Sequence, residues 1–228
     1  MYLKNPSPAF SRSGSGLLTS CLLLGAAPWC DAAIIANYEF TGGVLTSSDL
    51  DLDTTASDFT GTPAPTTAVT NRLTYAAANA PTTWSTSTGF ASFTLTPGSS
   101  PLSLASLSFD YGFNNIATGG NYTVRVFSSV TGFTDLSQSL YTFTNDDGSN
   151  SGNYAVTPTN RVITLSSLPA FQNISTPVEF RFYFTDGHTG ATRYHLLDNV
   201  VLNAVPEPSH AMLCLAGAGA FMVRRRRR

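Results

Sequence analysis

Short segments in which apolar and polar residues alternate run through the middle of the chain. The clearest is residues 178–184, where a valine and three phenylalanines alternate with Glu179, Arg181 and Tyr183. Successive side chains of a strand point to opposite faces, so this pattern predicts a strand with one face on a core. Apolar residues nowhere recur at helical spacing for long enough to predict a helix in this part of the chain.

Seven more segments have a similar pattern between turn residues. They are residues 34–40, 90–96, 107–113, 122–126, 140–144, 162–165 and 194–202. About eight to ten strands of this kind predict an all-β fold, a single β-sandwich or jelly roll. Residues 197–202 resemble the closing strand of galactose-binding-like and concanavalin-like jelly rolls, which implies a fold and no ligand. Residues 60–81, rich in Thr, Pro and Ala, predict a loop.

The N-terminal residues 1–33 have the features of a secretory signal peptide. Lys4 and Arg12 precede an eleven-residue apolar stretch at 17–27, which is too short to span a membrane. Cleavage is expected after Ala32 or Ala33. A competing interpretation takes residues 18–21 as a lipobox that would acylate Cys21. The β-sandwich ectodomain is therefore expected over residues 34–204.

Three features follow one another in residues 205–228. The first is a short motif, followed by an uncharged apolar run at 211–223 and then an arginine cluster. The motif is Val205, Pro206, Glu207, Pro208 and Ser209, and the cluster is Arg224, Arg225, Arg226, Arg227 and Arg228. Prolines end regular structure, and five arginines stay on the cytoplasmic side of a bilayer. The thirteen apolar residues span about 20 Å as a helix, against a hydrocarbon core of about 30 Å.

This order of motif, short hydrophobic helix and basic stop resembles the bacterial PEP-CTERM sorting signal. The resemblance rests on Pro206-Glu207-Pro208, residues 211–223 and the terminal arginines. It implies that the chain is a substrate of exosortase, a membrane-embedded, cysteine transpeptidase-like enzyme, and that it is exported into surface or extracellular matrix material. The alternative is an ordinary single-pass tail anchor, which normally needs about 20 apolar residues.

Charge and cysteine content narrow the function classes. Between residues 34 and 205, five arginines and no lysine accompany twelve acidic residues, a net charge of −7. This balance argues against nucleic-acid binding through a basic surface. Cys21, Cys30 and Cys214 all lie outside this region, which excludes a disulfide, a cysteine nucleophile and a cysteine metal site within it.

Acidic residues suggest two calcium sites. Asp49, Asp51 and Asp53 alternate with leucines, but the sixth and twelfth positions lack the Gly and Glu of a calcium loop, and the pattern also fits an edge strand. The second site would join Glu39 and Asp198, as in some carbohydrate-binding jelly rolls. Two donors are too few to specify a site, and Asp198 equally fits a bond to the backbone. We expect no cofactor, with structural calcium as the open alternative.

Catalytic signals are weak. No G-x-S-x-G or H-E-x-x-H motif is present, and His188 and His195 are expected to be solvent-facing loop residues. Four aromatic residues are candidates for stacking on sugars if they are exposed, namely Tyr75, Trp84, Tyr111 and Tyr122, although most aromatics of a sandwich belong to its core.

These observations favour a non-enzymatic, exported surface or extracellular-matrix protein. Its expected partner is an exosortase-like membrane enzyme, and its helix would hold it in the membrane until processing moves it to the surface or the medium. The alternative is a carbohydrate-binding module that holds matrix polysaccharide. A hydrolase that uses His188 or His195 is the third hypothesis.

Overall fold

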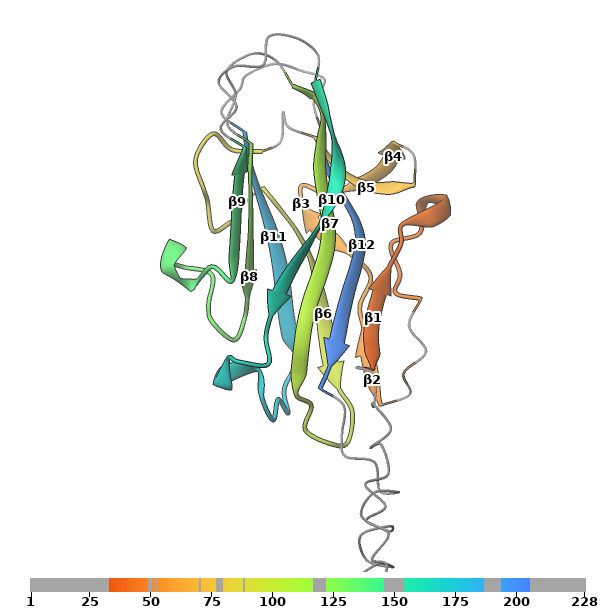
Figure 1. The fold of residues 1–228 in the computed structure, drawn as a ribbon, viewed down its shortest axis with the longest axis vertical. Helices are drawn as coiled ribbons and strands as arrows, with labels where there is room; N and C mark the ends of the chain where they lie inside the picture. The colour runs from red at the N-terminus through yellow and green to blue at the C-terminus, as the bar shows by residue number, and fades with distance from the viewer. Residues whose placement is uncertain are drawn as a thin grey trace, which may run out of the picture. The chain divides into compact units, whose positions relative to one another are not determined.

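Two antiparallel β-sheets face each other and form the layers of a sandwich (Figure 1). The computed structural model describes residues 33–48, 51, 53–69, 71–76, 80–87, 89–116, 122–145, 154–186 and 194–205, all within the compact unit Asp31–Arg228. Each sheet contains six strands. The expectation of an all-β fold is confirmed for these residues.

The first sheet has the order β10-β7-β12-β5-β4, and β1 also pairs with β12. Its strands are β1 (Ile34–Tyr38), β4 (Thr66–Val69), β5 (Arg72–Ala76), β7 (Leu104–Ile116), β10 (Tyr154–Thr164) and β12 (Tyr194–Ala204). The second sheet has the order β2-β6-β11-β8-β9, and β3 also pairs with β6. Its strands are β2 (Thr54–Ala56), β3 (Thr60–Thr62), β6 (Phe90–Pro97), β8 (Tyr122–Ser128), β9 (Tyr141–Asn145) and β11 (Val178–Asp186). The short 3-10 helices are η1 (Thr41–Gly43), η3 (Leu136–Gln138) and η4 (Pro169–Phe171).

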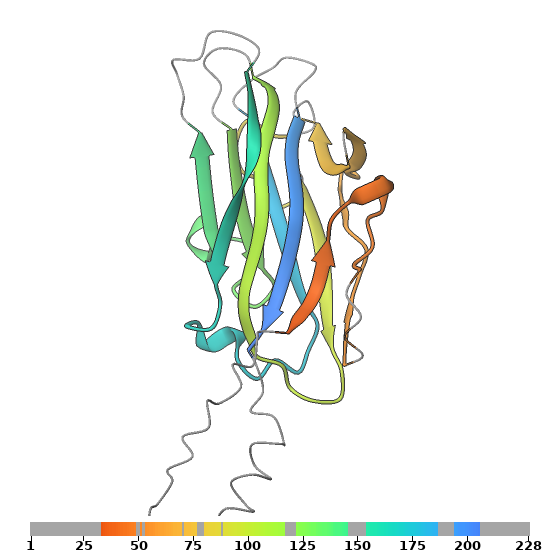
Figure 2. The same cartoon turned by 45° about the vertical axis from the view of Figure 1, so that its right-hand side comes forward.

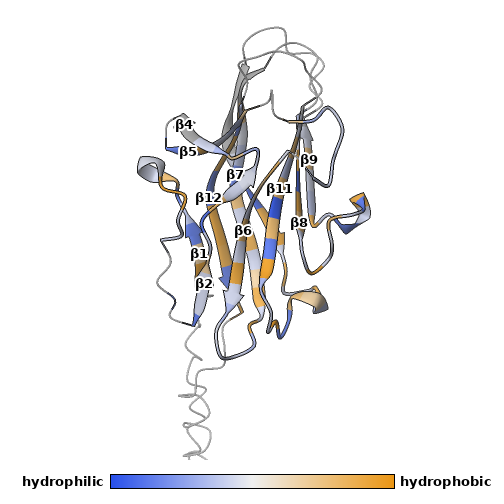
Figure 3. Ribbon diagram, turned by 180° about the vertical axis from the view of Figure 1, so that it is seen from behind, coloured by the Kyte–Doolittle hydropathy of each residue, from blue (hydrophilic) through white to orange (hydrophobic). Residues whose placement is uncertain are grey.

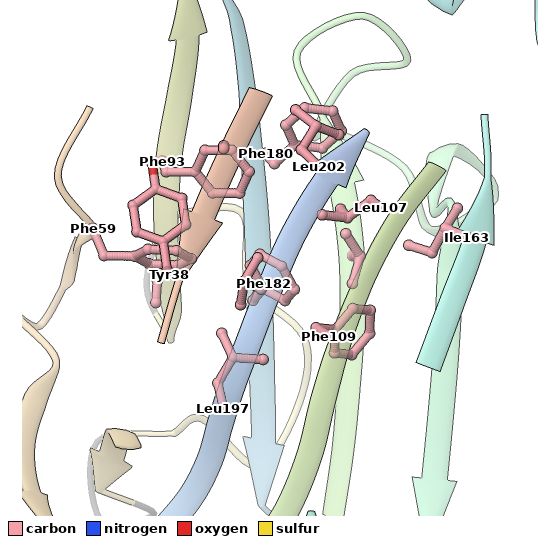
Figure 4. Packing of buried hydrophobic residues seen from close by; sticks show 14 of the residues in the cluster. Tyr38, Phe59, Phe93, Leu107, Phe109, Ile163, Phe180, Phe182, Leu197 and Leu202 are labelled. Carbon is pink, nitrogen blue, oxygen red and sulfur yellow. The ribbon is translucent and has the colours of Figure 1, made fainter. Parts of the chain in front are cut away.

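Aromatic side chains from both sheets fill the core (Figure 4). Phe182 of β11 meets Phe109 of β7 edge to face, with ring centroids 5.2 Å apart and an interplanar angle of 84°. Phe180 stacks on Phe93 of β6 at 5.4 Å. All four rings are at most 1% exposed. Such pairs add about 0.5–1.5 kcal/mol each to the free energy gained by area burial. The apolar face predicted for residues 178–184 therefore lies in the core.

A β-bulge interrupts β12. The pairing of β12 with β7 shifts register between Asp198 and Val201, and Asn199 has a φ of 46°. Before the bulge Leu197 faces the core, and after it Val200 and Leu202 do so, all three at 0% exposure. An extra residue on one strand of an antiparallel pair has this effect. The bulge therefore lets a sequence that breaks strict alternation keep its apolar residues inside.

The prediction of a loop over residues 60–81 is wrong for most of that segment. β3, β4 and β5 all lie within it, and β5 buries Leu73 and Tyr75 at 0% and 1% exposure. The Tyr75 hydroxyl also donates a 2.8 Å hydrogen bond to the carbonyl oxygen of Thr62. Threonine is enriched in strands as well as in loops, which explains how a Thr-rich composition concealed three strands.

β1 begins and β12 finishes at the same end of the sandwich, where the two strands pair (Figure 2). The backbone N–H of Ala204 donates a 2.8 Å hydrogen bond to the carbonyl oxygen of Ala33, and the N–H of Val205 donates a 2.7 Å bond to the carbonyl oxygen of Ser103. β11 begins at this end and finishes at the opposite one, near Asp186 (Figure 1). Segments that precede Ala33 or follow Val205 therefore attach to one end of the sandwich.

Candidate functional site

The outer face of the second sheet carries a row of threonines. Thr123 of β8 lies directly opposite Thr185 of β11 and Thr144 of β9. Residues directly opposite in antiparallel strands share a face, and the hydroxyls of Thr123 and Thr144 lie 3.0 Å apart in a hydrogen bond. Figure 3 shows hydrophilic and hydrophobic residues alternating along β11. The polar members belong to this outer face.

A loop over residues 80–87 and 89 covers part of the same face. Trp84 from this loop stacks on Phe127 of β8, with ring centroids 5.6 Å apart and planes 18° apart. The Tyr183 hydroxyl donates a 3.1 Å hydrogen bond to the carbonyl oxygen of Thr86. These contacts fix the loop to the sheet. They also explain why Tyr183, on the outer face as predicted, is only 1% exposed.

Between this loop, η3 and the threonine row lies a hollow of about 420 Å³, here called the Trp84 groove. Its lining residues come from the loop, from η3 and from the outer face of β8, β9 and β11. They are Thr82, Thr83, Trp84, Thr123, Arg125, Leu136, Thr144 and Thr185. The groove thus combines an indole, five threonine hydroxyls and one guanidinium, and none of the described residues lining it is acidic.

Arg125 is the cation of the groove. It is half-buried, and burial lowers the pKa of its guanidinium. Among the described residues its side chain has no ion pair and no hydrogen bond. Its direct neighbours, Tyr183 on β11 and Thr142 on β9, are neutral. A partly desolvated charge without a partner among the described residues is costly, and binding an anion would offset that cost.

Arg181, two residues from Tyr183 on β11, differs from Arg125 in having its partners within the protein. Its Nε and Nη2 donate to the two carboxylate oxygens of Glu179 at 2.7 and 3.0 Å, and Nη1 donates to the Tyr183 hydroxyl at 3.2 Å. Its guanidinium carbon lies 4.5 Å and 4.0 Å from the ring centroids of Phe90 and Phe133. A bidentate, stacked arginine of this kind stabilises the sheet.

A second hollow of about 450 Å³ lies at the end of the sandwich near η4. Small, amide and aliphatic residues line it, with no charged or aromatic side chain among the described ones. They are Ser129, Val130, Ala170, Gln172, Asn173, Ile174, Ser175, Thr176 and Pro177. This hollow offers backbone, hydroxyl and amide groups but no charged or aromatic side chain among the described residues, so the Trp84 groove is the better candidate for a specific ligand.

The calcium candidate at Glu39 and Asp198 finds other partners. One Asp198 oxygen lies 3.4 Å from Nε of Arg72, and the other accepts a 2.9 Å bond from the Asn199 backbone, so the expected bond to backbone is confirmed. Burial raises the pKa of Asp198, while the Asn199 backbone bond and then Arg72 oppose this shift. Glu39 accepts a 3.4 Å bond from Asn37. Within the described residues no group of three or more His, Cys, Asp and Glu could hold a metal ion.

The aspartates near residue 50 do not form an edge strand where the structure describes them. The backbone N–H of Asp53 donates a 2.9 Å bond to the Asp51 side chain, and Asp53 lies in a turn. β2 begins only at Thr54. This local bond shapes the approach to β2, whereas Asp49 lies outside the described residues.

The expectation of a solvent-facing histidine is wrong for His195. This residue lies in β12 at 0% exposure, and its Nδ1 shares a 2.8 Å hydrogen bond with the Tyr111 hydroxyl. Its Nε2 has no hydrogen-bond partner among the described residues. Burial lowers the pKa of His195 to about 3, so the imidazole is neutral at pH 7. His188 lies outside the described residues.

Three of the four aromatic candidates for sugar stacking are core residues. Tyr75, Tyr111 and Tyr122 are at most 1% exposed, whereas Trp84 is half-buried at the groove. The alternation at residues 122–126 indicated the position of Arg125, because it predicts that Thr123 and Arg125 lie on the outer face of the sheet. Nothing in the sequence indicated that Trp84 would lie over Phe127.

Most of the sorting motif, Pro206 to Ser209, and the five terminal arginines lie outside the described residues. Val205 itself is half-buried beside Ser103. In the part of the chain that is described, no helix is both long and apolar enough to cross a membrane.

Comparison with known proteins gives structural likenesses only. No family model and no curated protein matches the chain. A cleaved adhesin domain of Lys-gingipain from Porphyromonas gingivalis is 16% identical, with a TM-score of 0.39 over 74% of this chain and 97% of that one. A carbohydrate-binding module specific for non-crystalline cellulose is 14% identical, with a TM-score of 0.39 over 63% and 86%. The N-terminal cellulose-binding domain of a Cellulomonas fimi β-1,4-glucanase is 13% identical, with a TM-score of 0.32 over 70% and 93%.

Proposed function

We propose that this chain is an exported, non-catalytic surface or extracellular-matrix protein, delivered by a C-terminal sorting signal of the PEP-CTERM type. The observation that carries the proposal is the order of Pro206-Glu207-Pro208, the apolar residues 211–223 and the arginine cluster. The signal peptide sends the chain across the inner membrane, and the arginines stop it. An exosortase-like enzyme then acts near the motif, after which the domain reaches the surface or the medium.

The position of the described ends supports this proposal. Ala33 and Val205 both lie at one end of the sandwich, joined to neighbouring strands by the backbone bonds of Ala204 and Val205. A segment held in the membrane after Val205 would leave the opposite end directed away from the bilayer. Thr185 lies toward that opposite end, one residue before β11 finishes. The domain can therefore fold and expose this part of the groove before the tail is processed.

The test compares where three forms of the protein accumulate in the native host. Wild type is expected at the cell surface or in the medium, and Glu207→Ala is expected to remain in the inner membrane. Glu39→Ala is the matched control, because it removes the same charge from an exposed position outside the motif. Equal distribution of all three forms would show that the tail is a plain anchor or has no sorting role.

A second candidate function, polysaccharide binding, is favoured by the Trp84 groove. The groove offers an aromatic surface beside a row of hydroxyls, and sugars present apolar C–H faces edged by hydroxyl groups. Wild-type protein is expected to co-sediment with polysaccharide extracted from the host matrix, and Trp84→Ala to remain in solution. Unchanged co-sedimentation of Trp84→Ala would exclude the groove as the binding site.

A further inference from the structure

We infer that the Trp84 groove selects acidic sugars, binding a carboxylate-bearing residue of a polysaccharide with Arg125 as the anion-binding group. This inference rests on the second candidate function above and specifies its ligand. Arg125 and Trp84 line the same hollow together with the threonine row.

The pairing of the described arginines supports a ligand-binding role for Arg125. Arg72 lies 3.4 Å from Asp198, and Arg181 holds both oxygens of Glu179. Arg161 lies over the ring of Phe143, 4.2 Å from its centroid. Arg125 has none of these contacts within the described residues, although its neighbour on β11, Tyr183, already donates to Thr86. A planar guanidinium binds a carboxylate through two parallel hydrogen bonds, and Arg125 makes no such contact with any described residue.

The remaining lining suits a sugar rather than a simple anion. Thr123 and Thr144 hold their hydroxyls 3.0 Å apart, and hydroxyls both donate and accept hydrogen bonds. Trp84 is held against Phe127 at 5.6 Å and against the edge of Tyr183 at 6.1 Å, so its position is fixed before a ligand arrives. Preorganised side chains lower the entropy cost of binding. The hollow of about 420 Å³ also lies within the usual range for small-ligand sites.

Local charge explains how an acidic domain can hold an acidic polymer. The net charge of residues 34–205 is −7, yet the described lining of the groove contains one arginine and no carboxylate. Long-range repulsion between exposed charges is screened within about 8 Å at physiological ionic strength, whereas a contact in a partly buried site is screened less. The attraction is therefore confined to the groove.

The experiment measures binding of protein purified from its host to three polymers by affinity electrophoresis and calorimetry. Polygalacturonate supplies carboxylate-bearing sugars, hydroxyethyl cellulose supplies neutral sugars, and polyglutamate supplies carboxylates without sugars. Wild type is expected to bind polygalacturonate at least tenfold more tightly than either other polymer. Arg125→Gln should lose tenfold or more of this affinity and Arg125→Lys a smaller part, because lysine keeps the charge without the two-pronged geometry.

Arg72→Gln is the matched control, since it removes one arginine from the first sheet, and it should bind polygalacturonate as wild type does. Equal, Trp84-dependent binding to both polysaccharides would overturn the acidic selectivity and leave polysaccharide binding intact. Equal binding to polyglutamate would show that only charge is recognised, which overturns sugar recognition in the groove. If wild type binds neither the three polymers nor the host's matrix polysaccharide, both the acidic selectivity and the polysaccharide-binding function are overturned. The melting temperature of each variant confirms that it is folded.

Discussion

Tyr111 and His195 share a 2.8 Å hydrogen bond inside the core, on the neighbouring strands β7 and β12. The imidazole is surrounded by rings, with centroids 5.0 Å from Phe184 and 5.8 Å from Tyr122. Burial lowers the pKa of His195 from 6.5 to about 3. A neutral histidine therefore forms part of the hydrophobic packing between the two sheets.

This burial predicts acid sensitivity. The unfolded chain binds a proton at His195 below about pH 6.5, which the folded chain does not bind until about pH 3. The contribution of this group to stability is complete above pH 6.5 and is lost as the pH falls toward 3, by up to about 1.4 kcal/mol per pH unit. The difference in unfolding free energy between wild type and His195→Gln should shrink from pH 7 to pH 4. Parallel curves from urea titrations at each pH would contradict the assignment.

Phe182 of β11 is a fully buried residue of the core between the two sheets. It is 0% exposed and meets both Phe109 and Phe59, at 5.2 Å and 5.9 Å. Phe182→Ala should lower the unfolding free energy by about 3–5 kcal/mol, because it leaves a cavity in the core. Val162 is 57% exposed on β10, and Val162→Ala should change stability by about 0.5 kcal/mol or less. Comparable losses in the two variants, measured by chemical denaturation, would be inconsistent with this core.

Arg181 is expected to be a structural residue. Arg181→Lys keeps the charge but loses the double contact with Glu179 and the stacking on Phe90 and Phe133. The side chains of Arg181 and Glu179 are 22% and 26% exposed, so solvent reduces the contribution of the pair and the expected loss is about 1 kcal/mol. Thermal unfolding of wild type and Arg181→Lys measures this loss of stability. A drop in polygalacturonate binding without a drop in melting temperature would instead assign Arg181 to the ligand site.

Calcium should leave the melting temperature unchanged. Asp198 is engaged by Arg72 and by the Asn199 backbone, and Asn199 also donates a 2.8 Å bond from its side chain to Asp110. A calcium ion prefers six to eight oxygen ligands and would have to displace these partners. Equal melting temperatures in millimolar calcium and in EDTA are expected. A melting temperature that rises in calcium for wild type, but not for Asp198→Asn, would instead support the Glu39–Asp198 calcium site.

The strands that could be predicted from the sequence are those whose alternation comes from large apolar residues. Residues 178–184 and 107–113 place large apolar residues, mostly phenylalanine, at every second position, and both are strands with that face in the core. β3 and β4 could not be predicted in the same way, because their sequences, Thr-Gly-Thr and Thr-Thr-Ala-Val, contain no alternating large apolar residues.

The groove and the buried histidine depend on contacts between distant parts of the chain. Trp84 lies over Phe127 because the loop bends back across the sheet, and His195 is enclosed by Tyr111, Tyr122 and Phe184 from three other strands. Local pattern contains no information about such contacts. The exposure of Trp84 and of His195 therefore could not be predicted from the sequence.

The intact mass of the protein isolated from the cell surface or the medium of its host tests the central claim most directly. The account predicts a mass that lacks the N-terminal signal peptide and ends near residues 205–209, without residues 211–223 and the five arginines. A membrane-bound protein that retains Arg224 to Arg228 would contradict it and would leave the tail as an anchor.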